Sequence, residues 1–569
     1  MFGIHESNRG AFLEATREAR EERAAERRRE EAAIKIQATV RGWLVRCAMD
    51  KKIREKFDLL FGNEPAHADQ TTTLPLAMKV FAEVTRFIKI FKMEKDKKRF
   101  ETFARYLITS MDSENVKLSY VSVGMNKEHT LQWIQHMKDV LHIACKLLET
   151  LQAEVSSENR LISLYLHLLL TFTATNTWRL LRLENFEPLR PALNKLTENL
   201  MGDLVARGLY TTLNHVLVKG LCRGRIALRG PAITTVITLS LRPLAAAQYS
   251  EKLLSLATIH IMSVPALVHH LVTVASEASQ MLCHHGIFER VVEFVQTEQN
   301  LRIIFNTLEG SYALCLLANL VQLSFEERDA IFLKLAFPKF NFVVTRLLEK
   351  CGEYVTTKQS SLTQWHPVLG WFSRPLDQHI NESLGLVKTQ LQLLWSGPVI
   401  KIMFSTLTNM VRDQDAHIQE SGGLTALPIS PSSTSAAGSL GVLSSSSLIR
   451  KALERKLSAS SMPGSVKGGG GMRGGGSRKL GSQDVSTVAM VCSMYHTAIT
   501  TLSQLRMDIL TGLCYKSDMV HHLWLVLQSL GPTCGLKSFL DLLSVSTKAT
   551  APEFHLLMLF CDATTHLVT

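Results

Sequence analysis

The chain has 569 residues, of which 46% are hydrophobic and 20% are charged. This composition is typical of a globular protein of about two to four domains, and it excludes a chain that is disordered throughout. The formal net charge of +12 permits acidic partners. No interleaving of basic and aromatic residues indicates a nucleic-acid module, so we predict no nucleic-acid partner.

The N-terminus does not have the pattern of a secretory signal, because Glu6 and Arg9 are charged and no apolar stretch follows them. The most apolar run, residues 161–172, is too short to cross roughly 30 Å of hydrocarbon, and we interpret it as a buried core helix. The ten cysteines form no C-x-x-C pair, and most lie in apolar helical runs. We interpret them as reduced and buried, and we predict a cytoplasmic protein with no transmembrane segment.

Residues 1–60 are predicted to form one long charged helix that no proline interrupts. Opposite charges recur at helical spacing, as in Arg17 and Glu21. Residues 14–31 have almost no apolar face, which is typical of a helix surrounded by solvent.

Residues 36–46 of this helix match the complete IQ pattern, I-Q-x-x-x-R-G-x-x-x-R, at all five defined positions. Apolar side chains follow one another at i, i+4, i+7, i+8 and i+11, a spacing that makes a single stripe along a helix. The defined positions are Ile36, Gln37, Arg41, Gly42 and Arg46, and the stripe consists of Ile36, Val40, Trp43, Leu44 and Cys47. Such a stripe suits the adaptable, methionine-rich groove of a calmodulin-like protein.

The polar positions of the pattern suit the same partner. Arg41 and Arg46 flank the stripe and can reach an acidic rim, Gln37 offers an amide to backbone groups, and Gly42 permits close approach. Residues 35–56 contain seven basic and two acidic residues, an excess of five positive charges. We therefore predict calmodulin or a related EF-hand light chain as the partner. Two alternatives stay open: the stripe packs on the chain's own helical body, or the helix lies on an acidic membrane surface.

Residues 61–411 are predicted to form a helical array, so the fold class is all-α. Apolar residues recur at i, i+3, i+4 and i+7 in successive blocks, such as residues 133–148. Short breakers separate the blocks, as at Pro231, Pro265 and Pro338. No strict repeat period is present, so an α-solenoid and an irregular array stay equally open.

Residues 412–484 are rich in Ser, Gly and Pro, and they are predicted to form a disordered linker. Ser458 follows Arg455-Lys456-Leu457, which resembles the site of a basophilic kinase, so it is a candidate phosphorylation site. Helical patterning returns over residues 485–569. The sequence stops at Thr569 within such patterning, so we expect more protein to follow.

Other candidate sites are discounted, and we assign no catalytic residue, metal site or cofactor. The Cys283-His284-His285 cluster lacks a second ligand pair at zinc spacing. The aromatic segment 365–372 holds a histidine and two tryptophans, which we interpret as anchors of a turn between helices rather than as a ligand pocket. The glycine-rich segment 468–476 lacks the order of a phosphate-binding loop.

In combination and order, these features resemble the N-terminal part of the IQ-motif-bearing HECT-type ubiquitin-protein ligase family, with the closest likeness to its B paralogue. The segments that carry the resemblance are residues 17–23, 36–46, 110–115, 130–135, 259–267, 365–373, 509–513 and 559–562. The resemblance fades over residues 412–484, as expected for a disordered linker.

The resemblance implies that the full-length relative ends in a HECT domain, which receives ubiquitin on a catalytic cysteine from a conjugating enzyme and passes it to a substrate lysine. None of the ten cysteines corresponds to that nucleophile, so the chain alone is expected to be inactive. The implied role is a regulatory, calmodulin-binding and substrate-recruiting region in protein ubiquitination. It would meet protein substrates directly and the conjugating enzyme only through the missing HECT domain. A stand-alone, non-catalytic helical scaffold is the alternative.

Overall fold

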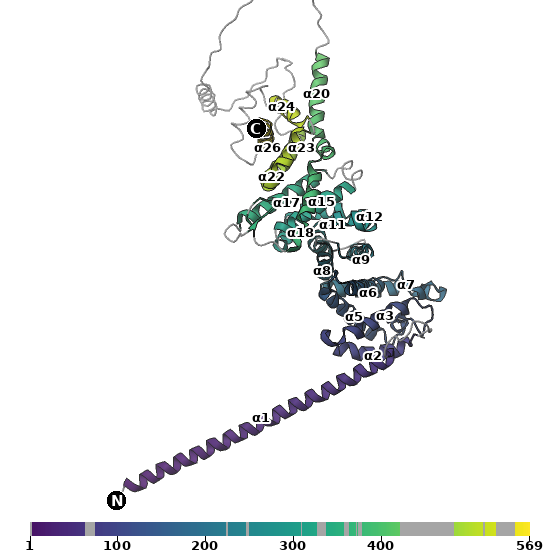
Figure 1. Ribbon diagram of the computed structural model, residues 1–569, viewed down its shortest axis with the longest axis vertical. Helices are drawn as coiled ribbons and strands as arrows, with labels where there is room; N and C mark the ends of the chain where they lie inside the picture. Colours follow the sequence, from purple (N-terminus) through teal and green to yellow (C-terminus); the bar gives the residue numbers. More distant parts are fainter. Residues whose placement is uncertain are drawn as a thin grey trace, which may run out of the picture. The chain divides into compact units, whose positions relative to one another are not determined.

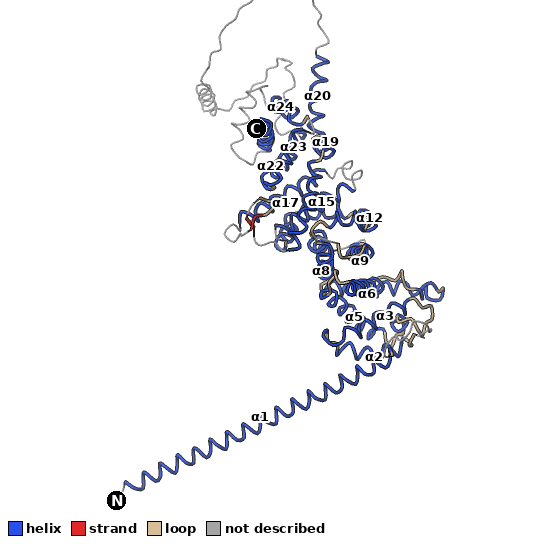
Figure 2. The backbone as a smooth tube through the Cα atoms, in the orientation of Figure 1, coloured by secondary structure: helices blue, strands red, loops and turns tan. Residues whose placement is uncertain are grey.

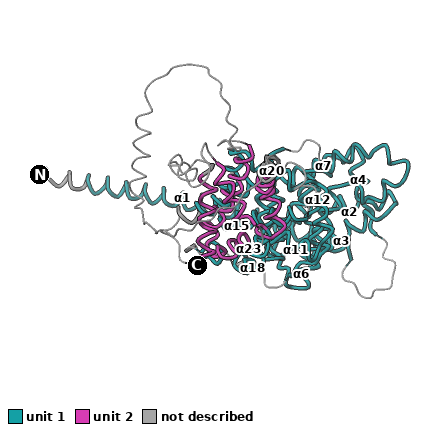
Figure 3. The backbone as a smooth tube through the Cα atoms, turned by 90° about the horizontal axis from the view of Figure 1, so that it is seen from above, with its two compact units in different colours: residues 1–393 teal, residues 394–569 magenta. Residues whose placement is uncertain are grey.

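The structure is a computed structural model, shown as a ribbon in Figure 1. It describes residues 3–62, 74–222, 226–245, 250–308, 310–326, 337–357, 364–370, 372–373, 378–421, 483–515, 518–530 and 552–568. Within these ranges the chain is almost entirely helical, which confirms the predicted all-α class. The chain divides into two compact units, Met1–Leu393 and Leu394–Thr569, which Figure 3 shows in different colours.

Helix α1 (Gly3–Phe61) confirms the predicted long N-terminal helix. It contains no proline and is rich in Ala, Glu and Arg, which are strong helix formers. Residues 9–49 are exposed or half-buried, and from residue 9 onward Phe57 is the first large side chain of α1 that is fully buried. The helix is therefore stabilised mainly by its own backbone and side-chain pairs until it reaches its C-terminal end.

The helices that follow in unit 1 lie on one another in chain order, as Figure 2 shows. In its first half these elements are α2 (Ala77–Ile90), α3 (Met93–Met111), α4 (Val121–Met125), α5 (Thr130–Thr150), α6 (Ser156–Phe172), η1 (Arg179–Arg182), η2 (Glu184–Leu189), α7 (Arg190–Ala206), α8 (Leu209–Leu221), α9 (Gly230–Leu241) and η3 (Arg242–Leu244). Helices pack on neighbours a few places along the chain, with α2 on α5, α3 on α6, α5 on α8 and α6 on α9.

Helical spacing of apolar residues explains this packing. Trp133, Met137 and Val140 lie on one face of α5 at i, i+4 and i+7, and all three are fully buried. Full burial of each such side chain contributes about 1.5–3 kcal/mol. The apolar run predicted as a core helix forms most of α6, where Leu169 and Phe172 have no exposed surface.

The second half of unit 1 continues the array. Its elements are α10 (Glu251–Ala257), the π-helical η4 (Thr258–Met262), α11 (Leu267–Val274), α12 (Ser276–His284), α13 (Ile287–Gln296), α14 (Glu298–Thr307), α15 (Gly310–Glu326), α17 (Phe337–Thr357), β1 (Gln364–Trp365), β2 (Phe372–Ser373) and α18 (Gln378–Gln392), followed by η6 (Leu393–Trp395). Among the described α-helices of this unit that follow the 59-residue α1, lengths vary from five residues in α4 to 21 in α5, so the array is irregular.

A buried amide holds the chain break before α11. Asn319 of α15 donates hydrogen bonds from Nδ2 to the carbonyl oxygens of Met262 and Val264, both at 2.8 Å. Its Oδ1 accepts one from the backbone amide of Val268 at 3.0 Å. The break falls at Pro265, one of the predicted breakers, and Asn319 supplies side-chain hydrogen-bond partners to backbone groups on both sides of it.

The aromatic segment forms a turn, as predicted, but its anchor is the histidine. Strands β1 and β2 pair antiparallel around this turn. His366 is fully buried, and its Nδ1 accepts hydrogen bonds from the amides of Val368 and Leu369. Trp365 is 51% exposed, so the prediction that it anchors the turn is wrong. A histidine can satisfy two turn amides that an indole, which has no acceptor, cannot. Trp371 lies outside the described residues.

Unit 2 joins the helices on both sides of the predicted linker. Its elements are α19 (Gly397–Met403), α20 (Ser405–Ser421), α22 (Gln483–Thr501), η7 (Ser503–Leu505), α23 (Arg506–Tyr515), α24 (Met519–Ser529) and α26 (Pro552–Val568). Helix α22 packs along α26, and α20 packs on α22 and α24. Helix α20 extends past Arg412, where the linker was expected to begin, because the first glycine after it is Gly422.

Among the described residues, no single helix is both long and apolar enough to cross a membrane. Two bent pairs reach that length and apolar character only in combination: Glu251–Met262 with Leu267–Val274, and Gln483–Thr501 with Ser503–Tyr515.

Candidate functional site

The predicted IQ residues all lie on the part of α1 that precedes its anchored end. Their apolar side chains are open to solvent, with exposed fractions of 64% for Ile36, 47% for Val40, 58% for Trp43 and 54% for Leu44. Gln37, Arg41 and Arg46 are also exposed. The alternative in which the stripe packs on the chain's own body is therefore wrong for the described residues, because each of these side chains keeps about half of its surface in water.

Gly42 lies beneath the second arginine of the pattern. A Cβ atom at this position would stand 3.4 Å from Nη1 of Arg46. The guanidinium of Arg46 therefore lies over the backbone at Gly42, beside the stripe. A partner that grips the stripe meets this charge at the edge of the contact.

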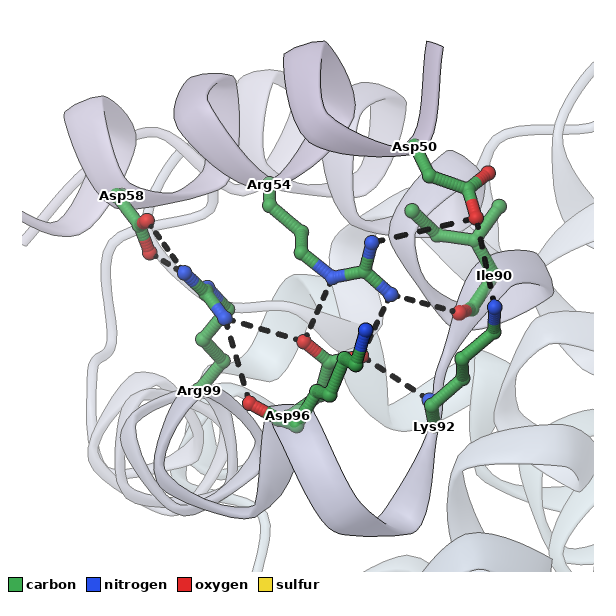
Figure 4. Close-up of polar contacts among 8 residues, drawn as sticks. Asp50, Arg54, Asp58, Ile90, Lys92, Asp96 and Arg99 are labelled. Atoms are coloured by element: carbon green, nitrogen blue, oxygen red, sulfur yellow. Dashed lines mark hydrogen bonds and ion pairs between the residues drawn. The ribbon is translucent and has the colours of Figure 1, made fainter. Parts of the chain in front are cut away.

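The C-terminal end of α1 is anchored to α3 by an ion pair that is almost fully buried (Figure 4). Nε and Nη2 of Arg54 donate to the two carboxylate oxygens of Asp96 at 2.9 and 3.0 Å, a bidentate pair. Nη2 of Arg54 also donates to the carbonyl oxygen of Ile90 at 3.2 Å, at the end of α2. One side chain of α1 thus joins two helices of the body.

A second bidentate pair runs in the opposite sense. Arg99 of α3 donates from Nε and Nη2 to the carboxylate of Asp58 in α1, with both distances 2.8 Å. Its Nη1 reaches Asp96 at 3.1 Å. Because each helix contributes one arginine and one aspartate, a shift of α1 along α3 by one turn would break both pairs. The crossed pairs therefore set the position of α1 on the body.

The electrostatics of Asp96 agree with this role. Burial acts to raise the pKa of the carboxyl group. Hydrogen bonds from Arg54 and from the Lys92 amide, together with the charges of Arg54 and Arg99, outweigh that effect and hold the pKa below its ordinary value. Asp96 is consequently ionised at neutral pH, although it has no exposed surface.

Aromatic packing completes the anchor. Phe57 of α1 is 2% exposed, and its ring centre lies 4.4 Å from that of Phe87 in α2 and 4.7 Å from that of Phe61. Close aromatic pairs add about 0.5–1.5 kcal/mol beyond their buried area. The last two turns of α1 are thus held by apolar and ionic contacts together.

This anchor does not follow from the sequence pattern. Arg54 is one of the seven basic residues of segment 35–56 that were expected to be available to a partner, but its guanidinium is paired with Asp96. The excess of positive charge near the IQ segment is therefore smaller than the count suggests. The partners are 42 and 41 residues apart in the sequence, and no local spacing rule connects positions so distant.

The discounted sites lie elsewhere. His284 and His285 of the Cys-His cluster stack edge to face with ring centres 5.5 Å apart. No group of three metal-ligating side chains occurs among the described residues. The cysteines do not all follow the prediction, since Cys47 and Cys561 are exposed. Ser458, the candidate phosphorylation site, lies outside the described residues.

Comparison with known proteins gives two findings. A family model of the IQ calmodulin-binding motif matches residues 30–50. The whole chain aligns with ubiquitin-protein ligase E3B of Homo sapiens at 38% identity, in an alignment of 580 residues. It aligns with the protein of the same name in Mus musculus at 38% identity, in an alignment of 570 residues. No solved structure matches the chain.

The chain spans about half the length of these curated relatives, because the matched region covers 51% of each. The match extends over all of this chain, including both compact units and the exposed helix α1. The chain therefore contains an IQ motif and is similar, over the whole of its own sequence, to about half of ubiquitin-protein ligase E3B.

Proposed function

We propose that this chain is the regulatory, calmodulin-binding region of a HECT-type E3 ubiquitin-protein ligase and that it recruits protein substrates. The observation that carries the calmodulin part is the exposure of the whole IQ stripe on a helix whose far end is anchored. An unpartnered apolar stripe with flanking arginines is a ready contact for the methionine-rich groove of an EF-hand protein.

The ubiquitin-ligase part rests on the printed name of the relatives and on the extent of the similarity. The corresponding region of such a ligase would present its helical array to substrates, while a separate HECT domain carries out the transfer. A stand-alone, non-catalytic scaffold differs from this proposal only in lacking that domain.

Three buried cysteines of unit 1 are poorly suited to act as nucleophiles. Burial raises the pKa of Cys145 and of Cys351 to about 12 and that of Cys315 well above its ordinary value. A thiol protonated at neutral pH is a poor nucleophile, because thioester exchange requires the thiolate. These three side chains therefore serve packing. Formation of a ubiquitin thioester on this chain would contradict the proposed role.

The calmodulin contact is tested by titration calorimetry with the full chain, with calcium and with a calcium chelator. We expect the double variant Ile36→Ala/Arg41→Ala to weaken binding at least tenfold, or roughly 1.4 kcal/mol. Both side chains are exposed, so the substitutions should leave the fold of the chain intact.

The matched control is Leu13→Ala/Arg20→Ala, which also removes one exposed apolar and one exposed basic side chain from α1 but lies outside the IQ segment. This control should bind calmodulin as the unaltered chain does. Equal affinities for the unaltered chain and the IQ variant would refute the proposed contact, as would a lack of calmodulin binding under both conditions.

A further inference from the structure

The IQ stripe and the anchored end of α1 lie on the same face of the helix. The spacing alternates between four and three residues along the whole segment, which keeps these side chains on one side. The positions are Ile36, Val40, Trp43, Cys47, Asp50, Arg54, Phe57 and Phe61. The exposed fraction is 64% at Ile36, 47% at Val40 and 58% at Trp43, but only 24% at Asp50, 15% at Arg54 and 2% at Phe57, and Phe61 is half-buried. One continuous seam is thus open at its N-terminal half and packed on the body at its C-terminal half.

The open half of the seam therefore faces the side of α1 on which the body lies. The body meets this face of α1 at the corner between α2 and α3, residues 89–95, which we call the α2–α3 corner. Nζ of Lys92 lies 3.8 Å from Oδ2 of Asp50, as Figure 4 shows. Asp50 is only four residues beyond Arg46, an axial rise of about 6 Å.

An EF-hand lobe on the stripe is large enough to reach the level of the corner. A lobe of about 70 residues has a radius of gyration of about 11 Å, and a compact sphere with that radius of gyration has a diameter of about 28 Å. The stripe from Ile36 to Cys47 rises by about 16 Å. A lobe centred on the stripe extends about 6 Å past each end of it, which reaches the level of Asp50 and of the α2–α3 corner.

The charge of the corner suits an acidic partner. Five lysines lie between positions 89 and 98, against Glu94 and Asp96, and Asp96 is already engaged by two arginines. Lys89, Lys92 and Lys95 are all exposed. EF-hand proteins carry dense carboxylates because their calcium loops supply acidic ligands. Sequence reasoning did not single out these lysines, since they are more than 40 residues from the IQ motif.

We propose that the EF-hand protein bound to the IQ stripe also contacts the α2–α3 corner, with Lys89, Lys92 and Lys95 pairing with its carboxylates. This proposal rests on the proposed function, because it concerns the same partner. The site of that partner is thereby composite: an apolar stripe on α1 and a basic surface on the body, held in register by the crossed ion pairs of Arg54 and Arg99. Binding of the partner then depends on the position of α1 relative to the body.

The experiment compares the full chain with the triple variant Lys89→Gln/Lys92→Gln/Lys95→Gln in calorimetric titrations with calmodulin. We expect the variant to bind about fivefold more weakly or worse at low ionic strength. The difference should shrink at about 0.5 M salt, because screening weakens exposed charge pairs. The control variant Lys127→Gln/Lys195→Gln/Lys252→Gln removes three exposed lysines elsewhere in unit 1 and should bind normally.

A zero-length coupling of carboxyl groups to amines provides a second readout. In the complex, mass spectrometry should identify linkages from calmodulin carboxylates to Lys92 or Lys95. Equal affinity of the triple variant and the unaltered chain, with no such linkage, would overturn the composite site while leaving the IQ contact intact. If calmodulin binds neither protein, the proposed function itself fails. Binding to vesicles with anionic lipids that the triple variant loses, with calmodulin affinity unchanged, would assign the corner to membranes and overturn the proposal.

Discussion

At the scale of single residues, the anchor of α1 depends on Asp96 having a cationic partner. Arg54→Ala should destabilise the contact between α1 and the body by roughly 2 kcal/mol, because it leaves a buried carboxylate with fewer donors. Faster amide exchange in residues 52–61 would report this loss. The exposed pair of Arg17 and Glu21 gives the control, and Arg17→Ala should change stability by less than about 0.5 kcal/mol.

The pair Arg54→Leu/Asp96→Leu should be more stable than Arg54→Ala alone, because it removes the buried charge together with its partner. A double variant that is less stable than the single one would show that the remaining contacts of Asp96, with Arg99 and the Lys92 amide, outweigh the cost of burying its charge. The sequence predicted the five IQ positions, since they follow a local pattern. It did not predict this pair, whose partners come together only when α1 and α3 meet.

At the scale of one element, the two parts of α1 are stabilised in different ways. Its residues 9–47 have no core to pack on and depend on pairs such as Arg17–Glu21, each worth about 0.3–0.5 kcal/mol. Its last turns are buried against α2 and α3. We therefore expect amide hydrogens of residues 9–47 to exchange much faster than those of residues 52–61.

Bound calmodulin should slow exchange within residues 36–47 and leave residues 9–30 unchanged, which mass-spectrometric exchange would resolve. Uniform protection along α1 without a partner would contradict this division.

Composition and the lack of proline were enough to predict α1 as a single helix. They could not predict where its support changes from solvent to core, because that depends on the burial of Phe57 by Phe87 of another helix.

At the scale of the whole molecule, helical periodicity predicted an all-α chain but not how its helices are grouped. Composition placed a break at residues 412–484, whereas the two compact units divide after Leu393. Helix α20 belongs with α22 and α24, which follow the predicted linker in the sequence. Tertiary packing of apolar faces decides which helices group together. The periodicity of apolar residues shows which face of a helix is buried, but not which other helix covers that face.

Unit 1 contains three buried histidines. Because of them, we expect unit 1 to lose stability in acid at pH values well above those at which carboxyl groups titrate. Burial lowers the pKa of His136 to about 3 and those of His270 and His366 to about 4, from 6.5. The unfolded chain therefore takes up protons from pH 6.5 downward while the folded unit does not. The stabilisation by neutral imidazoles is complete above pH 6.5 and is lost as the pH falls toward the folded values.

Between pH 7 and pH 5 each of these histidines should cost about 2 kcal/mol of stability, because one pKa unit corresponds to about 1.36 kcal/mol. Calorimetric melting of the full chain at several pH values measures the effect on the transition of unit 1. His366→Gln should reduce the pH dependence by about one third, since glutamine can still accept a hydrogen bond in the turn but does not titrate. A melting temperature that stays constant from pH 7 to pH 5 would show that the three rings are protonated in the folded protein. Their burial would then have to be offset by acceptors.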